Sequence, residues 1–156
     1  MNILRRNVLK SAGAASVVSV AMAAGLLKSG AVFAADWNKA AFDAKALDAA
    51  MSAMGLSGAA ASGNITVKAP DIAENGAVVP VEITSAIAGT ESIAIFGEKN
   101  SLPLIAAFHF ANGAQGYVST RIKMGATSNV RAVVKAGGKL YSAAKEVKVT
   151  IGGCGG

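Results

Sequence analysis

The chain has 156 residues, of which 15 are Lys or Arg and 9 are Asp or Glu, and its formal net charge is +6. It contains one cysteine and one histidine, which excludes an internal disulfide and a Cys/His metal cluster. No Cys-x-x-Cys-His motif for covalent haem attachment occurs. We therefore expect no metal and no other cofactor.

Residues 1–34 are typical of a cleaved secretory signal. Arg5 and Arg6 precede an apolar run from about Ala12 to Leu27, and the small or modest residues 32–34 suit a cleavage site. The apolar run falls short of the ~20 residues that a membrane-spanning helix needs, and Lys28 closes it. The pattern thus predicts an exported chain with no stable membrane anchor.

The start of this leader, Leu4-Arg5-Arg6-Asn7-Val8-Leu9-Lys10, resembles the twin-arginine export motif. Both arginines, the second leucine and the lysine match the usual form, whereas the first and fifth residues depart from it. That pathway carries folded proteins. The resemblance therefore implies that the chain leaves the cytoplasm already folded or already paired with a partner.

Removal of the leader changes the charge of the protein. Its four basic residues, taken from the fifteen of the whole chain, leave eleven against nine acidic ones, so a nucleic-acid partner is rejected. Residues 35–120 then carry 4 basic and 8 acidic side chains, and residues 121–156 carry 7 and 1. The basic third is either an ordinary solvated surface or a region that favours anionic ligands or acidic partners.

Residues 35–63 are expected to form a helical segment followed by a linker. Apolar residues recur at spacings of three and four from Asp36, the expected N-cap, to Met54. Gly55 and the small residues 57–63 end this pattern. We interpret Met51 and Met54 as core residues rather than ligands.

From Asn64 onward the pattern indicates short strands separated by turn signals such as Asn75-Gly76 and Gly137-Gly138. The expected strands are Ile65–Lys68, Val78–Ser85, Ser92–Phe96, Leu104–Phe110, Gly116–Lys123, Asn129–Lys135 and Lys139–Thr150. About seven short strands predict a mainly β protein, an immunoglobulin-like antiparallel β-sandwich over residues 64–151. Pro80 within its strand suggests an edge strand or a bulge.

Alternation assigns the faces of several strands. One face of 117–124 would bury Val118, Thr120, Ile122 and Met124, and the other would expose Ser119, Arg121 and Lys123. Leu104, Ala106, Phe108 and Phe110 would likewise point inward. His109 would then lie at the surface, and no second catalytic group accompanies it.

The chain ends in Gly152-Gly153-Cys154-Gly155-Gly156. Buried cysteines pack as small hydrophobes, but Cys154 lies on a segment without side chains and with maximal backbone freedom. We interpret residues 152–156 as a flexible arm that presents a thiol. No Lys, Arg or His lies within five residues of Cys154 to favour its thiolate, so the hypothesis is that a partner's pocket activates the sulfur.

Four stretches resemble the SoxY family of periplasmic thiosulfate-oxidation proteins. They are Pro70–Gly76, Ser119–Met124, Val130–Lys135 and, most specifically, the tail Lys145–Gly156. A departure is Asn100-Ser101-Leu102-Pro103, where a second proline after the asparagine is expected.

The resemblance implies a periplasmic sulfur carrier without catalysis of its own. A haem-containing enzyme would join thiosulfate to Cys154, a thiosulfohydrolase would release sulfate, and a sulfane dehydrogenase, where one exists, would oxidise the remaining persulfide sulfur. A SoxZ-like subunit would complete a heterodimer.

Other readings of the tail remain open. An exported structural β-sandwich could dimerise through a Cys154–Cys154 disulfide, although four flanking glycines make a poor rigid junction. A ubiquitin-like sulfur carrier also ends in Gly-Gly, but needs no cysteine and no export signal. An independent redox enzyme would need a second cysteine or a cofactor motif.

Overall fold

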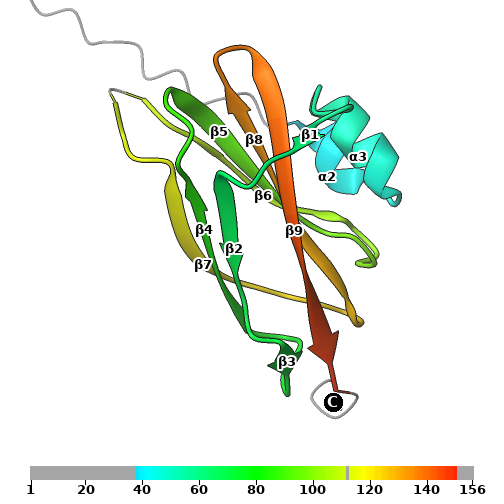
Figure 1. The fold of residues 1–156 in the computed structure, drawn as a ribbon. Coiled ribbons are helices and arrows are strands. Elements are labelled where there is room, and N and C mark those ends of the chain that lie inside the picture. The colour runs from blue at the N-terminus through cyan, green and yellow to red at the C-terminus, as the bar shows by residue number, and fades with distance from the viewer. Residues whose placement is uncertain (1–37, 112, 151–156) are drawn as a thin grey trace, which may run out of the picture. The chain divides into compact units, whose positions relative to one another are not determined.

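Two open β-sheets face each other in the computed structural model, which describes residues 38–111 and 113–150 (Figure 1). The strands are β1 (Ala60–Ala61), β2 (Ile65–Lys68), β3 (Ile72–Ala73), β4 (Val79–Ser85), β5 (Thr90–Gly97), β6 (Leu104–His109), β7 (Tyr117–Ile122), β8 (Ser128–Ala136) and β9 (Lys139–Val149). The larger sheet has the order β1-β9-β8-β5-β6, with β3 also paired to β9, and the smaller has the order β2-β4-β7. The predicted β-sandwich is confirmed.

Every strand expected from the sequence is present, and its ends differ by no more than two residues. The long β8–β9 hairpin turns at Gly137 and Gly138, whose φ angles are 56° and 72°. Positive φ at both central residues is the requirement of the type I′ turn, whose twist matches that of the flanking strands. The Gly-Gly turn signal was therefore correctly placed.

The space between the sheets is filled by apolar side chains from both. Ile83 of the smaller sheet and Ile93 and Val130 of the larger sheet are fully buried there. The expected alternation of β7 is confirmed. Val118, Ile122 and Met124 are buried and Thr120 is half-buried, whereas Ser119, Arg121 and Lys123 are exposed.

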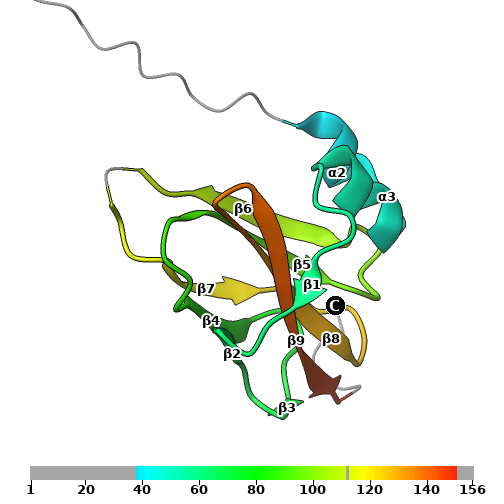
Figure 2. The ribbon, with the colours of Figure 1, turned by 45° about the horizontal axis from the view of Figure 1, so that its top comes forward.

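Two short helices cover the outer face of the larger sheet, away from the smaller sheet (Figures 1 and 2). They are α2 (Lys39–Asp43) and α3 (Leu47–Ala53). Ala41 and Ala50 of these helices pack in one cluster with Phe96 of β5. Because β5 is covered on both faces, its second part, from Ile93 to Gly97, is continuously apolar instead of alternating.

The single helix expected from Asp36 to Met54 is wrong, since the chain is extended at Ala44 (φ −64°, ψ 131°). Asn38 caps α2 by accepting a hydrogen bond from the Ala41 backbone N–H, and its Nδ2 donates to the Ala53 carbonyl at 2.8 Å. One side chain thus joins both helices. Asp36, the expected cap, lies outside the described residues.

The pairing differs from the expected antiparallel pattern in two places. β1, within the stretch expected to be a linker, and β3 each pair in parallel with β9.

β4 is the middle strand of its sheet, but β2 ends at Lys68 opposite Glu82, so Pro80 has a neighbouring strand on one side only. The proline signal therefore marks part of a strand and not the whole strand.

A bulge changes the faces of β6. The register shifts between Ile95 and Phe96, and Leu104 packs in the helix-side cluster, whereas Phe108 packs in the cluster between the sheets. The expectation that Leu104 and Phe108 share a face is wrong for this reason.

Among the described residues, no helix is both long and apolar enough to cross a membrane.

Candidate functional site

The predicted thiol Cys154, its neighbours Gly152, Gly153, Gly155 and Gly156, and the export residues Arg5 and Arg6 all lie outside the described residues. The structure does describe the segment from which the predicted arm extends. We call Lys148, Val149 and Thr150, at the end of β9, the arm root.

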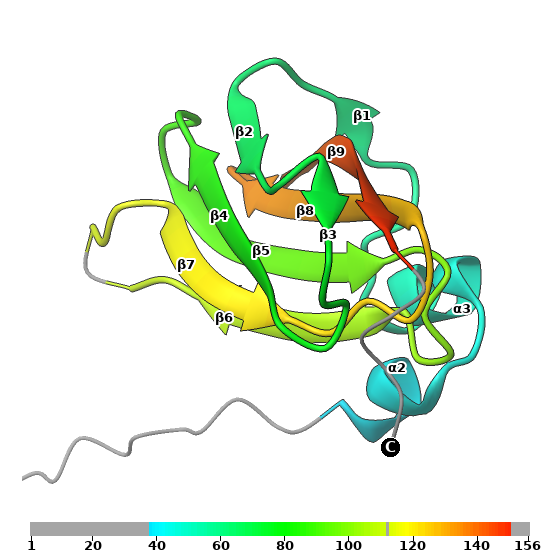
Figure 3. The ribbon, with the colours of Figure 1, turned by 90° about the horizontal axis from the view of Figure 1, so that it is seen from below.

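The arm root is bonded on one side by β3. The Lys148 N–H donates to the Asp71 carbonyl at 2.9 Å, and the Thr150 N–H donates to the Ala73 carbonyl at 3.1 Å. Figures 1 and 3 show this two-residue strand beside the end of β9. Hydrogen bonds to a segment far away in the sequence thus hold β9 up to its last residues.

A threonine hydroxyl holds the residue between these two. The Val149 N–H donates to Thr127 Oγ1 at 2.9 Å, and the same hydroxyl lies 3.4 Å from the Val149 carbonyl oxygen. All three backbone N–H groups of the arm root are therefore satisfied. Every such bond must open before the chain can move at Lys148, Val149 or Thr150.

Gly76 is required by close packing beneath the arm root. A Cβ atom there would lie 2.4 Å from the Met124 carbonyl oxygen and 2.8 Å from Val149 Cγ1. The Gly76 carbonyl also accepts the Met124 N–H at 2.7 Å. The Asn75-Gly76 turn was expected, but its glycine provides space for Val149 rather than an unusual φ angle.

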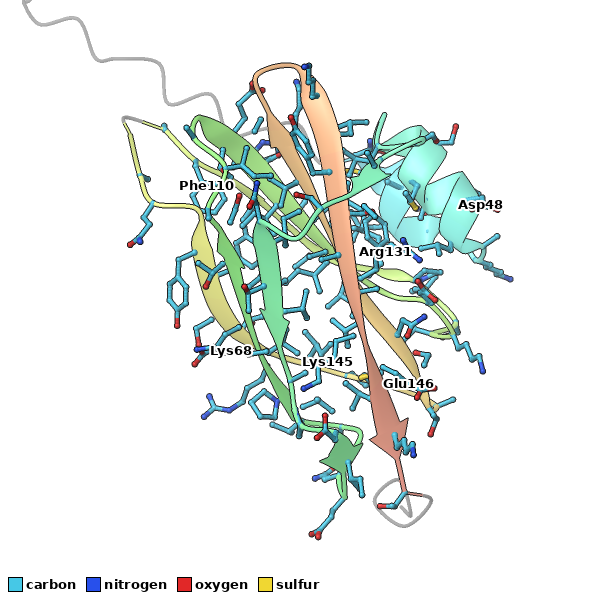
Figure 4. All side chains as sticks on the ribbon, in the orientation of Figure 1. Asp48, Lys68, Phe110, Arg131, Lys145 and Glu146 are labelled. Atoms are coloured by element: carbon cyan, nitrogen blue, oxygen red, sulfur yellow. The ribbon has the colours of Figure 1, made fainter. Side chains whose placement is uncertain are left out.

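Lys145 ties β9 to the chain that leads into β3. Its Nζ donates to the Ala69 carbonyl at 2.6 Å and pairs with Asp71 Oδ1 at 3.0 Å. Lys145 and Glu146 extend from opposite sides of β9 (Figure 4). These contacts fix the strand on which the arm root ends.

The basic C-terminal third is partly neutralised by the acidic first half. Arg131 pairs with Glu98 at 2.6 Å, and Lys135 pairs with Glu91 at 3.3 Å, in addition to the Lys145 pair. Hydrogen bonding from Lys135 lowers the pKa of the Glu91 carboxyl below its ordinary value of 4.5. These pairs favour the interpretation of this region as an ordinary surface.

His109 is exposed, as expected. It lines a cavity of about 340 Å³ together with Met54, Leu56 and Lys135. Within 38–111 and 113–150, no three His, Cys, Asp or Glu side chains are grouped to hold a metal ion. What the described residues provide next to the predicted arm is a clamped strand end.

Sequence reasoning missed the roles of Thr127, Ala73 and Gly76 in holding the arm root. The stretch Pro70–Gly76 had been noted only for its turn residues and for its resemblance to a family. Its periodicity gave no signal, because a two-residue strand is too short to alternate.

Comparison with known proteins agrees with this description. The sequence matches the family described as sulfur oxidation protein SoxY over residues 51–154, which is more than half of the chain. A structure of the sulfur carrier protein SoxY from Chlorobium limicola f thiosulfatophilum is 44% identical, covering 64% of this chain and 92% of that one, with a TM-score of 0.57.

A superoxide reductase (neelaredoxin) from Ignicoccus hospitalis is 17% identical over 56% of this chain and 80% of that one, with a TM-score of 0.47. No curated protein matches the sequence. The family match and the 44% identical structure together support a carrier role in sulfur oxidation. The chain belongs to the SoxY family of sulfur oxidation proteins.

Proposed function

We propose that this protein carries sulfur intermediates covalently on Cys154 and presents them to partner enzymes during thiosulfate oxidation. The observation that carries the proposal is the clamped arm root, followed by a glycine-flanked cysteine. The family match ends at residue 154, the cysteine itself, and a relative of 44% identity is named a sulfur carrier protein.

The length of the arm sets how far the sulfur travels. Cys154 lies four positions after Thr150 in the sequence. At ~3.3–3.6 Å per residue, Cys154 reaches at most ~14 Å from Thr150. Glycines on both sides of the cysteine allow the backbone to enter a channel in which larger side chains would clash.

In the proposed sequence of steps, a haem-containing enzyme joins thiosulfate to the Cys154 sulfur and takes up the electrons released as the sulfur–sulfur bond forms. A thiosulfohydrolase then adds water to the resulting thiosulfonate and releases sulfate, leaving a persulfide. A sulfane dehydrogenase, where the organism has one, oxidises the outer sulfur to a sulfonate, which a second hydrolysis removes. The protein itself supplies attachment and delivery, not catalysis.

The proposal includes export to the periplasm and assembly with a SoxZ-like subunit. Residues 1–34, with Arg5 and Arg6, act as a cleaved twin-arginine signal. Residues 35–63 are the helical segment and linker, residues 64–151 the β-sandwich, and residues 152–156 the arm. A partner lacking a signal of its own would be exported as part of a folded pair.

Intact mass of the mature protein from thiosulfate-grown cells tests the proposal, measured with and without a thiol reductant. Reducible adducts of one sulfur atom or one thiosulfate group are expected on the wild type. They should be absent from the Cys154→Ser variant. A bare thiol, or only a Cys154–Cys154 dimer, would instead support an exported structural sandwich.

A further inference from the structure

The stretch Pro70–Gly76 contains one large side chain that the fold does not use. Asp71 and Ala73 accept hydrogen bonds from the arm root, and Gly76 makes room for Val149. Ile72 is 58% exposed, although it lies between the two residues whose carbonyls accept these hydrogen bonds. Packing explains its neighbours but does not explain an isoleucine at this position.

Ile72 lies directly beside the arm root. It is the registered neighbour of Lys148 in the parallel β3–β9 pair, and in such a pair registered side chains project from the same face. Val78, beyond the turn that follows β3, is another large apolar side chain that is 51% exposed. One exposed apolar residue thus lies within the segment that holds the arm root, and a second follows that segment two positions after Gly76.

The short arm restricts which molecule covers this surface. Because Cys154 reaches at most ~14 Å from the clamped Thr150, an enzyme that takes the thiol into a channel must bring the channel entrance close to Thr150. That entrance then meets the neighbouring Ile72. A subunit that stayed bound over Ile72 would block every enzyme that needs this approach.

We infer that Ile72 is the docking contact for the rim of the enzyme channel that receives Cys154, and that this rim is apolar. The inference rests on the proposed carrier function and adds the surface that partner enzymes recognise. The body of the protein then contributes to recognition as well as the arm.

The test measures the rate at which thiosulfate becomes attached to Cys154. Purified mature protein at graded concentrations is mixed with thiosulfate and extract of thiosulfate-grown source cells deleted for this chain, and adducts are followed by intact mass. Replacing Ile72 with serine should raise the half-saturating protein concentration by about five- to tenfold. This is the affinity lost when the exposed surface of one isoleucine is no longer buried against the enzyme. Ile72→Val should restore most of the loss.

Tyr117→Ser provides a matched control. Tyr117 is 45% exposed, but it begins β7, whose other end, Ile122, pairs with Val79. It is therefore about 17 Å along the strand from the end that adjoins β3. Unfolding of each variant and the reaction of its thiol with a small disulfide reagent are measured in parallel, and both should be unchanged.

The outcomes separate the two proposals. If the wild type gains no adduct, the carrier function fails and the docking inference falls with it. If the wild type gains adducts and Ile72→Ser behaves alike, or Tyr117→Ser loses as much, the docking inference alone is overturned. It is also overturned if Ile72→Ser speeds the reaction of the thiol with the small disulfide, since Ile72 would then cover the chain's own arm. The same holds if the wild type sediments as a dimer and Ile72→Ser does not, since Ile72 would then contact a second copy of this chain.

Discussion

Substituting Gly76 with alanine tests whether the arm root is held by close packing. The added Cβ would lie 2.4 Å from the Met124 carbonyl oxygen and 2.8 Å from Val149 Cγ1. The first of these atoms belongs to the backbone, so a side-chain rotation cannot relieve the overlap. The loop of Gly76 must instead move away from Met124 and Val149.

The expected cost has two parts. Overpacking of a well-packed site typically costs about 1–3 kcal/mol. The movement also weakens the 2.7 Å hydrogen bond from the Met124 N–H to the Gly76 carbonyl, which contributes about 1 kcal/mol. Gly76→Ala should therefore lower the free energy of unfolding by about 2–4 kcal/mol.

Urea unfolding followed by circular dichroism measures this change, and Gly63→Ala is the matched control. A Cβ at Gly63 meets nothing within 4 Å, and no positive φ is recorded there. Its replacement should be neutral, or stabilising by up to about 1 kcal/mol through the unfolded chain. Equal midpoints for the two variants would refute the claim that Gly76 is needed for space.

Two further predictions concern ion pairs remote from the arm root. Arg131→Met should lower the free energy of unfolding by about 1–2 kcal/mol, because the Arg131–Glu98 pair is mostly buried. Lys68→Met breaks a long and exposed pair and should cost less than about 0.5 kcal/mol. Equal losses of stability in the two variants would contradict this prediction. Lys135→Met should raise the NMR-measured pKa of Glu91 toward 4.5, since the Lys135 hydrogen bond is the largest cause of its lowering. Because the folded pKa is the lower one, the small stabilisation from Glu91 is present above the unfolded pKa and is lost as pH falls through the folded value, and an unchanged titration in the variant would contradict the assignment.

The strands of the sandwich could be predicted because short-range signals agree with the tertiary structure. In β7 the alternation of Val118 and Ile122 with Arg121 follows from one buried face, and in the β8–β9 turn two glycines allow the positive φ angles that the hairpin needs. These signals come from neighbouring residues, so the sequence alone carries them.

The helical segment was predicted less well because its break depends on distant contacts. Its apolar spacing continues through Ala44, but the chain is extended there, and Asn38 bonds across to Ala53. The bulge likewise places Leu104 in the helix-side cluster, among residues distant in the sequence. Neither effect leaves a periodic trace.

The candidate site divides in the same way. The glycine-flanked Cys154 is evident from residue types alone, and it remains a prediction because it lies outside the described residues. The clamp could not be read from the sequence, because a backbone carbonyl of Ala73 holds Thr150 and the hydroxyl of Thr127 holds Val149. Backbone carbonyls are present at every residue, so only the fold reveals which of them hold the arm root.

Thr127 provides the most direct control over where the arm begins. Thr127→Val keeps the shape of the side chain but removes the hydroxyl that accepts the Val149 N–H at 2.9 Å. The loss should cost about 1 kcal/mol and speed hydrogen exchange of the Val149 amide by roughly fivefold, if that amide exchanges by local opening. Thr66→Val, at an exposed strand position, is the control and should leave this amide unchanged. Equal exchange of Val149 in both variants would mean that the hydroxyl does not hold the strand end. Faster exchange in Thr127→Val alone would mean that the hydroxyl, together with the β3 bonds on either side of Val149, keeps this residue from joining the arm. The clamp would then limit the volume through which Cys154 can move.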